Sequence, residues 1–272
     1  MSGERLTLVA PADSLTAQLV RTLRRLPEEG LGDFCVIGGL AVLCRVGTLY
    51  RATSDLDTVI DDGPAIAALR ARPAVESTTN GVSIGGTTVD MIEIGPVDDP
   101  DQLPDDPALR LFVVAHRFAY DSSTRVGVEV VDPHEPGAVD VRAEVDMASP
   151  AALVGMKLRS YPTRRGPGIV KQGSDLQDLH ALLERHDAGG ALGQTLAGAP
   201  FGLGELCADA ARTLLVDDAE VAAGRVRRYT STQIEPDAFR AVGRRLIASI
   251  EAAATRRPAN LSAQPTEDGT RG

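Results

Sequence analysis

The chain has 272 residues, of which 43% are hydrophobic and 24% charged, a composition typical of a globular protein with a sizeable core. Its formal net charge of −10 argues against a protein that coats nucleic acid non-specifically, because such binding requires many Lys and Arg side chains facing phosphate. Aromatic residues make up only 3% of the chain and Trp is absent, so a stacking platform for single-stranded nucleic acid is not expected either.

The cysteines and the N-terminus limit the class of protein further. Cys35, Cys44 and Cys207 form no CxxC pair, which argues against a disulfide framework and a structural zinc site. The N-terminus lacks the cationic start and apolar core of a signal peptide, and no apolar run of about 18 residues occurs. We therefore expect a soluble cytoplasmic protein with free thiols and no membrane partner.

The first part of the chain alternates between helix and strand patterns. Ser14 is a candidate N-cap for a helix over 14–26, in which Leu15, Leu19, Leu23 and Leu26 form an apolar stripe. The segments that follow predict a buried strand "FCVIGG" (34–39), a short helix "LAVLCRVG" (40–47), a strand "LDTVID" (56–61) and a helix that begins at Pro64.

The middle of the chain predicts further strands. Two apolar runs flank Gly85 and Gly86 in "GVSIGGTTVDMIEIG", which indicates a hairpin. A loop rich in Pro and Asp occupies 98–107. Strand-like segments come next: "LFVVAHRFAY" (111–120), "VGVEVV" (126–131) and "VDVRAEVDM" (139–147).

From Pro150 onward the hydrophobic pattern changes to a helical period. The predicted fold class is therefore α+β: a core with a mixed β-sheet over 1–149, a helical domain over 150–256 that carries Lys and Asp motifs, and a disordered tail over 257–272.

Two aspartates at the start of the strand after the glycine pair are the first candidate site residues. Asp55 and Asp57 are two positions apart, so in a strand both carboxylates project to the same side. Paired carboxylates suit Mg²⁺ or Mn²⁺ together with substrate phosphate oxygens, although such a pair also occurs at solvated strand ends and turns.

Two neighbouring features favour the metal interpretation. Gly38 and Gly39 separate a strand from a helix, where backbone N–H groups at the helix start can bind a triphosphate; the alternative is a tight turn alone. Asp90 lies in an apolar strand, where a charge is costly without a partner. It is either a hairpin-end residue or the third metal ligand.

Together these motifs resemble the nucleotidyltransferase superfamily of DNA polymerase β type, whose pattern is a Gly-Gly or Gly-Ser turn, a D-x-D pair and a third acid on a following strand. More narrowly, "IGGLAV" and "YRATSDLD" resemble the AbiEii and MenT group of toxin nucleotidyltransferases. In addition, "SPAALVGMKLRSYPTRR" is similar to the Lys-bearing helix of that group, and "KQGSDLQDLHAL" to its R/K-D-x-x-D-L motif. The resemblance covers about residues 30–185 and implies a polymerase β-like core.

The resemblance also implies a reaction and roles for individual residues. A nucleoside monophosphate passes from an NTP to an acceptor hydroxyl, with pyrophosphate released. Asp55, Asp57 and Asp90 would hold Mg²⁺ or Mn²⁺; Lys157, which could otherwise be an ordinary exposed helix lysine, would meet the NTP phosphates.

A fourth acid and a serine complete the predicted site. The resemblance assigns an essential acid to Asp175, which we place in the first turn of a helix. Asp178 remains an alternative, because Ser174 stands where the motif has Arg or Lys. Ser54, directly before Asp55, is a nucleotide-binding candidate, or it completes a turn by a hydrogen bond.

The acceptor is less well defined by the sequence. Arginines concentrate in the helical part of the chain, for example in "GRVRRY" and "FRAVGRR", which fits either solvated helix faces or an RNA that docks through its phosphates. The resemblance implies a tRNA 3′ end as acceptor and a cognate antitoxin protein as partner. The acid-rich loop 98–107 keeps open an alternative, transfer to a cationic small molecule such as an aminoglycoside.

Overall fold

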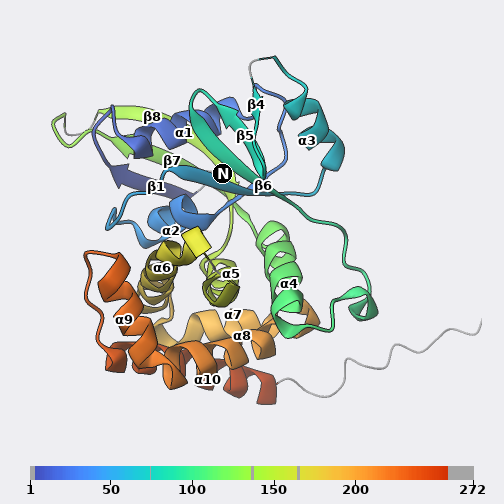
Figure 1. Ribbon diagram of the computed structural model, residues 1–272, viewed down its shortest axis with the longest axis vertical. Helices are drawn as coiled ribbons and strands as arrows, with labels where there is room; N and C mark the ends of the chain where they lie inside the picture. The colour runs from blue at the N-terminus through green and yellow to red at the C-terminus, as the bar shows by residue number, and fades with distance from the viewer. Residues whose placement is uncertain (1–3, 74, 136–137, 164–165, 257–272) are drawn as a thin grey trace, which may run out of the picture.

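The computed structural model describes residues 4–73, 75–135, 138–163 and 166–256 (Figure 1). The tail predicted over 257–272 lies outside the described residues. The chain forms a mixed β-sheet and a layer of helices beneath it (Figure 1). This arrangement confirms the α+β fold class.

The sheet contains eight strands in the order β1-β7-β8-β2-β3-β6-β5-β4. Parallel pairs (β1 with β7, β2 with β8, β3 with β6) are combined with antiparallel ones. The strands are β1 (Glu4–Val9), β2 (Cys35–Ile37), β3 (Asp55–Ile60), β4 (Glu76–Ser77), β5 (Gly81–Ile84), β6 (Thr87–Glu93), β7 (Thr124–Val131) and β8 (Val139–Met147).

The helices separate into those that cover the sheet and those that lie farther away. In Figure 1, α1 lies on the upper side of the sheet, whereas α2, α5 and α6 lie beneath it, and α7, α8 and α10 form the bottom of the molecule. The α-helices are α1 (Leu15–Arg25), α2 (Gly38–Val46), α3 (Gly63–Arg70), α4 (Pro107–Asp121), α5 (Pro150–Thr163), α6 (Lys171–His186), α7 (Ala191–Gly198), α8 (Leu203–Ala211), α9 (Ala219–Tyr229) and α10 (Pro236–Thr255).

Several local signals in the sequence operate as expected. The Ser14 hydroxyl accepts a hydrogen bond from the Ala17 backbone N–H at 3.2 Å, which caps α1. Gly85 and Gly86 have φ angles of +58° and +81°, a left-handed conformation that glycine adopts without steric cost. The hairpin of β5 and β6 is therefore confirmed. Leu15, in contrast, is 53% exposed and does not belong to the apolar stripe.

The strand predicted over 111–120 is wrong, because this segment belongs to the helix α4. The Asp106 carboxylate caps the helix by accepting a hydrogen bond from the Leu109 N–H at 2.8 Å. Pro107 follows at the first helical position, where the fixed φ angle of proline suits a helix. The buried residues of α4 also follow a helical spacing, with Leu111, Val114, Ala115, Phe118 and Ala119 on one side. The run of apolar residues alone could not distinguish these two structures. The strand β1 was not predicted.

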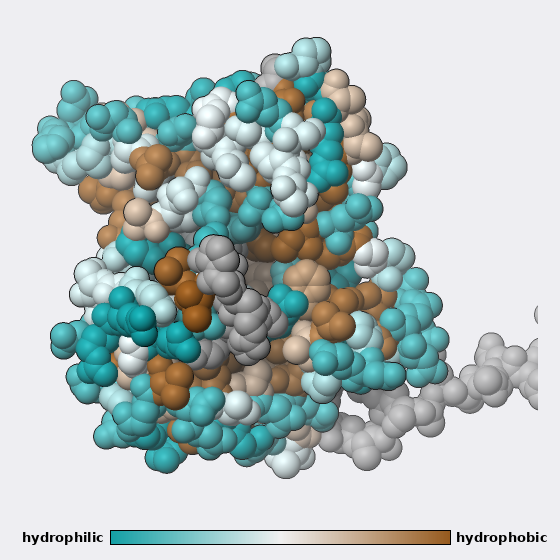
Figure 2. All heavy atoms as spheres, viewed as in Figure 1, coloured by the Kyte–Doolittle hydropathy of each residue, from teal (hydrophilic) through white to brown (hydrophobic). Residues whose placement is uncertain are grey.

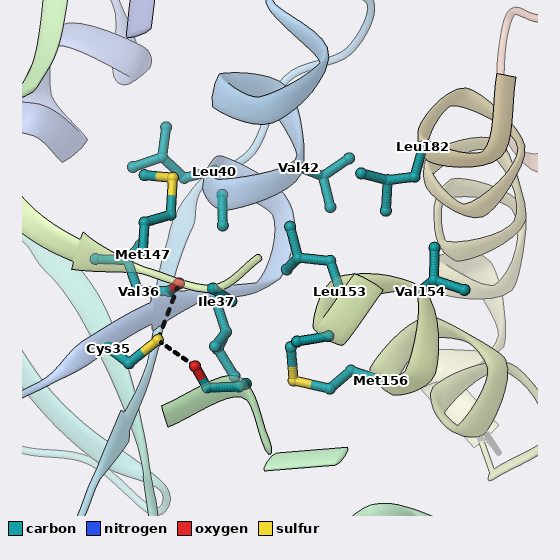
Figure 3. Packing of buried hydrophobic residues seen from close by; sticks show 14 of the residues in the cluster. Cys35, Val36, Ile37, Leu40, Val42, Met147, Leu153, Val154, Met156 and Leu182 are labelled. Atoms are coloured by element: carbon teal, nitrogen blue, oxygen red, sulfur yellow. Dashed lines mark hydrogen bonds between the residues drawn. The ribbon is translucent and has the colours of Figure 1, made fainter. Parts of the chain in front are cut away.

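A shared core fixes the helical layer against the sheet. All three residues of β2 are buried, and Figure 3 shows Val42 of α2 facing Leu153 of α5 and Leu182 of α6. Cys35 is a free, buried thiol whose Sγ donates to the Ala119 carbonyl at 3.4 Å. Because the side chains of a protein interior are close-packed, this core fixes the positions of the helices, and of their side chains, relative to the strand ends.

We expect Asp106→Ala to lower the free energy of unfolding by about 1 kcal/mol, because α4 then loses its N-cap. Urea unfolding followed by circular dichroism measures the change. Asp105→Ala is the matched control, since Asp105 is also exposed but is not the cap. An equal effect of both substitutions would contradict the capping role.

Candidate active site

Three carboxylates meet on the neighbouring strands β3 and β6. The strands run parallel with Asp57 paired to Asp90 in register, and Asp55 shares the face of Asp57 because side chains alternate along a strand. One carboxylate oxygen from each residue lies within 4.8 Å of the others. The structure thus brings together the three residues proposed as metal ligands, and all three are half-buried.

Burial and mutual repulsion oppose the ionisation of this cluster. Burial raises the pKa of Asp57 to about 6, and the charge of Asp55 adds to the shift, whereas the charge of Lys157 opposes it. Burial and the charge of Asp55 also raise the pKa of Asp90. Carboxylates in this situation gain most from a bound cation, which removes the repulsion.

Gly38 lets the Asp57 carboxylate lie against the start of α2. Its φ is +69°, and a Cβ at this position would lie 1.9 Å from Oδ2 of Asp57. The neighbouring Gly39 is also crowded, since its Cβ would lie 2.7 Å from a guanidinium nitrogen of Arg51 and 2.8 Å from the hydroxyl of Thr53. Both glycines therefore permit close approach at a helix start that has no side-chain cap.

The loop before β3 presents hydroxyl groups beside the cluster. Thr53 is buried and its hydroxyl donates to Oδ1 of Asp55 at 3.3 Å. The hydroxyl that binds the Asp55 carboxylate is therefore that of Thr53. Ser54 is exposed and lines a hollow next to Asp55.

Lys157 lies beside the carboxylates, on α5, and is buried. Its side chain is 10% exposed, and its Nζ donates to Asp175 at 2.7 Å and lies 2.8 Å from Asp178. The interpretation of Lys157 as an exposed helix lysine is wrong. A buried ammonium is stable only with such partners.

Both candidate acids of α6 contact this lysine. Burial opposes the charge of Asp178, but Lys157 and Arg51 outweigh it and lower the pKa of Asp178. The helix begins at Lys171, which places Asp175 in the second turn. The expectation of a first-turn acid stabilised by the helix dipole is wrong; the stabilising charge is Lys157.

Sequence reasoning missed the part of Arg51 in this network. The Arg51 guanidinium donates to both oxygens of Asp178, at 2.7 and 2.6 Å, and the Tyr50 hydroxyl donates to the same carboxylate at 2.8 Å. Asp178 is 0% exposed. A bidentate pair of this kind is geometrically specific, so it joins α6 to the loop that precedes β3. Arg51 lies within "YRATSDLD", the segment that indicated the family.

Lys171, the first residue of α6, is not among the site residues that the sequence predicts. Its Nζ lies 2.8 Å from Oδ2 of Asp55. Burial alone would raise the pKa of Asp55, but the hydrogen bond and charge of Lys171 lower it below its ordinary value. No sequence signal predicted this contact, because the two residues are more than a hundred positions apart.

Two hollows adjoin the carboxylates and share Asp57, Asp90, Lys157 and Asp175. The larger measures about 560 Å³, and its wall includes Arg70, Phe112 and Arg159. The smaller measures about 300 Å³ and is lined by Gly39, Thr53, Ser54 and Lys171 among others. In Figure 2, hydrophobic residues gather between the sheet, above, and the helices, below.

One protein-family model matches most of the chain. The family model described as "Nucleotidyl transferase AbiEii toxin, Type IV TA system" matches residues 21–241. Among solved structures, the chain is similar to an antigenic nucleotidyltransferase-like protein from Paracoccidioides brasiliensis, with 18% identity, a TM-score of 0.43 and coverage of 82% of this chain and 96% of that one. No curated protein matches significantly in sequence.

Within residues 4–73, 75–135, 138–163 and 166–256, no helix combines the length and the hydrophobicity that a membrane-spanning segment needs.

We expect Gly38→Ala to weaken Mg²⁺ binding by tenfold or more, because the new Cβ displaces the Asp57 carboxylate. Gly47→Ala is the matched control: Gly47 has a similar φ of +76° but no atom within 4 Å of its Cβ position. Both substitutions should cost about 1 kcal/mol of stability through the left-handed backbone. Urea unfolding and Mg²⁺ titration separate these effects, and equal metal binding by both variants would refute the steric argument.

We expect Asp57→Asn to stabilise the metal-free protein at pH 7.5 by up to ~3 kcal/mol. The pKa of Asp57 is raised in the folded state from 3.8 to about 6, so the folded protein loses stability as pH rises between these values, where only the unfolded chain is ionised. The advantage of the variant should vanish at pH 3.5. Mg²⁺ should raise the melting temperature of the wild type but not of the variant.

Asp55→Asn serves as the control, because it should change the stability of the metal-free protein in the opposite direction. The pKa of Asp55 is lowered by Lys171, so this substitution should destabilise the metal-free protein at pH 7.5. If both variants shift the melting temperature in the same direction at that pH, the assignment of repulsion to Asp57 is incorrect.

Proposed function

The chain belongs to the AbiEii family of nucleotidyltransferase toxins of type IV toxin–antitoxin systems, and from this premise we propose that it transfers a nucleoside monophosphate from an NTP to an RNA hydroxyl, at the 3′ end of a tRNA. The observation that carries the proposal is the carboxylate cluster of Asp55, Asp57 and Asp90 between two hollows. One hollow is available for each of two substrates, and the reactive centre lies where they meet.

The chemistry of the cluster fits a divalent metal. Three carboxylates with oxygens within 4.8 Å of one another, two of them with raised pKa values, supply the hard oxygen ligands that Mg²⁺ and Mn²⁺ take. Bound there, such ions stabilise charge on the attacking and leaving oxygens of phosphoryl transfer. Asp55 and Asp57 would hold the metal from β3, and Asp90 would hold it from β6.

The smaller hollow is proposed as the site of the NTP phosphates. It is lined by Gly39, Ser54 and Lys157, and Gly38 begins the adjoining helix α2. Backbone N–H groups at that helix start favour an anion. Lys157, held between Asp175 and Asp178, also lines this hollow, where its positive charge would attract the phosphates. Asp175 orients Lys157, and Asp178 anchors this pair to Arg51.

The larger hollow is proposed as the site of the acceptor end. Asp90 lines both this hollow and the smaller one, and in this proposal its carboxylate accepts the proton of the attacking hydroxyl. Arg70 and Arg159 also line this hollow, and the Arg159 guanidinium lies 4.5 Å from the centre of the Phe112 ring. Arginines together with an aromatic ring suit a nucleotide, through phosphate contacts and stacking.

These arginines favour RNA over a cationic small molecule. The acid-rich loop 98–107, which kept aminoglycosides in consideration, supplies none of the described residues that line the larger hollow. Two of the C-terminal arginines are already paired with acids: Arg240 pairs with Glu220 and Asp237, and Arg245 lies near Glu184. These two arginines therefore support RNA binding less than the sequence suggested. We therefore place the acceptor contact at the larger hollow.

The family also bears on partners and location. A type IV toxin has an antitoxin partner, and we propose that a cognate antitoxin protein opposes this enzyme. Since tRNA and NTPs occur in the cytoplasm, we propose that the enzyme acts there.

The test is label transfer from each ribonucleoside triphosphate, labelled at the α-phosphate, to total tRNA or to an aminoglycoside panel. We expect Mg²⁺-dependent labelling of tRNA, lost on removal of its 3′ terminal nucleotide and on chelation with EDTA. Asp57→Asn should reduce the rate at least ~100-fold, because stabilisation of several kcal/mol is lost. Asp98→Asn, in the exposed loop, is the matched control. Labelling of aminoglycosides alone would favour the alternative.

A further inference from the structure

The two lysines of this chain, Lys157 and Lys171, are its only ones among 28 basic residues. Both lie beside the carboxylate cluster, one buried and the other half-exposed. Elsewhere the chain uses arginine throughout. The compact ammonium of lysine, on a stem with several rotatable bonds, can change partners more readily than a planar guanidinium.

Both carboxylate oxygens of Asp55 are occupied by side chains of the protein. Oδ1 accepts from the Thr53 hydroxyl at 3.3 Å, and Oδ2 accepts from Nζ of Lys171 at 2.8 Å. An ammonium group and a divalent cation at the same carboxylate oxygen repel each other. A metal that binds Oδ2 of Asp55 therefore weakens the contact of Lys171 with this oxygen and favours its move to another acceptor.

The contact of Lys171 is the weaker of the two. Thr53 is 7% exposed, whereas the Lys171 side chain is 51% exposed, and ion pairs with such exposure are weak because water screens them. Lys157 differs, since it is buried and its Nζ lies within 2.8 Å of two carboxylates, those of Asp175 and Asp178. Of these two lysines, Lys171 is the one that can move.

A displaced Lys171 remains beside the proposed phosphate site. It lines the smaller hollow with Gly39, Ser54 and Ser174. We propose that Lys171 changes partner during the catalytic cycle: it neutralises Asp55 while the site lacks metal, and it binds the triphosphate of the NTP once Asp55 ligates the metal. This inference rests on the proposed function and adds a substrate-binding residue to it.

Acylation of lysine by an amine-selective reagent provides the first test, because peptide mass spectrometry resolves the two lysines. Mg²⁺ alone should raise the acylation rate of Lys171 about two- to fivefold, since the weak ion pair is lost. Mg²⁺ with non-hydrolysable NTP analogues should then lower the rate below that of the metal-free protein. Lys157 should stay unreactive throughout as the internal control.

Substitution of Lys171 provides a second test, in which the affinities for Mg²⁺ and for the NTP analogue should change in opposite directions. Lys171→Met keeps the length of the stem but removes the charge, so Mg²⁺ should bind about two- to fivefold more tightly and the NTP analogue about tenfold more weakly. Lys171→Arg, the charge-retaining control, should keep most of the analogue affinity. Calorimetric titration measures both ligands without turnover.

The outcomes distinguish this inference from the proposed function. If wild-type protein binds Mg²⁺ and the analogue, but Lys171 acylates at one rate in all conditions, Lys171 is a static surface residue and the inference is overturned. If Lys171→Met weakens Mg²⁺ and leaves the analogue affinity unchanged, it is likewise overturned. If wild-type protein binds neither ligand, the proposed function itself fails.

Discussion

The constraint on which the rest of the structure depends is the pairing of β3 with β6 in parallel register. It places Asp57 opposite Asp90 and brings Asp55 to the same side. Three carboxylates so close together repel one another, and burial increases the cost, as the raised pKa of Asp57 indicates. Such an unfavourable arrangement of carboxylates is typical of a site that is completed by a ligand.

The helical layer compensates this charge through side chains fixed in position. Lys157 lies between Asp175 and Asp178, and Arg51 binds the second of these acids with two hydrogen bonds. Because these groups are buried, removing Lys157 would leave two buried carboxylates with less compensating charge. The network therefore fixes α5 and α6 to the loop that leads into Asp55, and the positive charges stay next to the carboxylates.

The two halves of the chain contribute differently to the site. The sheet supplies the carboxylates and the glycine turn, whereas α5 and α6 supply both lysines. The packing of Val42 against Leu153 and Leu182 holds these contributions in register (Figure 3). The role of the helices is thus electrostatic as well as structural, and the hollows form where the two halves meet.

The sequence by itself determined the α+β class, the glycine turn, the spaced acids and the lysine-bearing helix, because these depend on local periodicity, caps and short motifs. Tertiary structure decided the rest. It showed that 111–120 is helical, that Arg51 and Lys157 share Asp178, and that Lys171 reaches Asp55. The contacts of Arg51 with Asp178 and of Lys171 with Asp55 join residues more than a hundred positions apart. Their existence depends on how the layers pack, which no local pattern encodes.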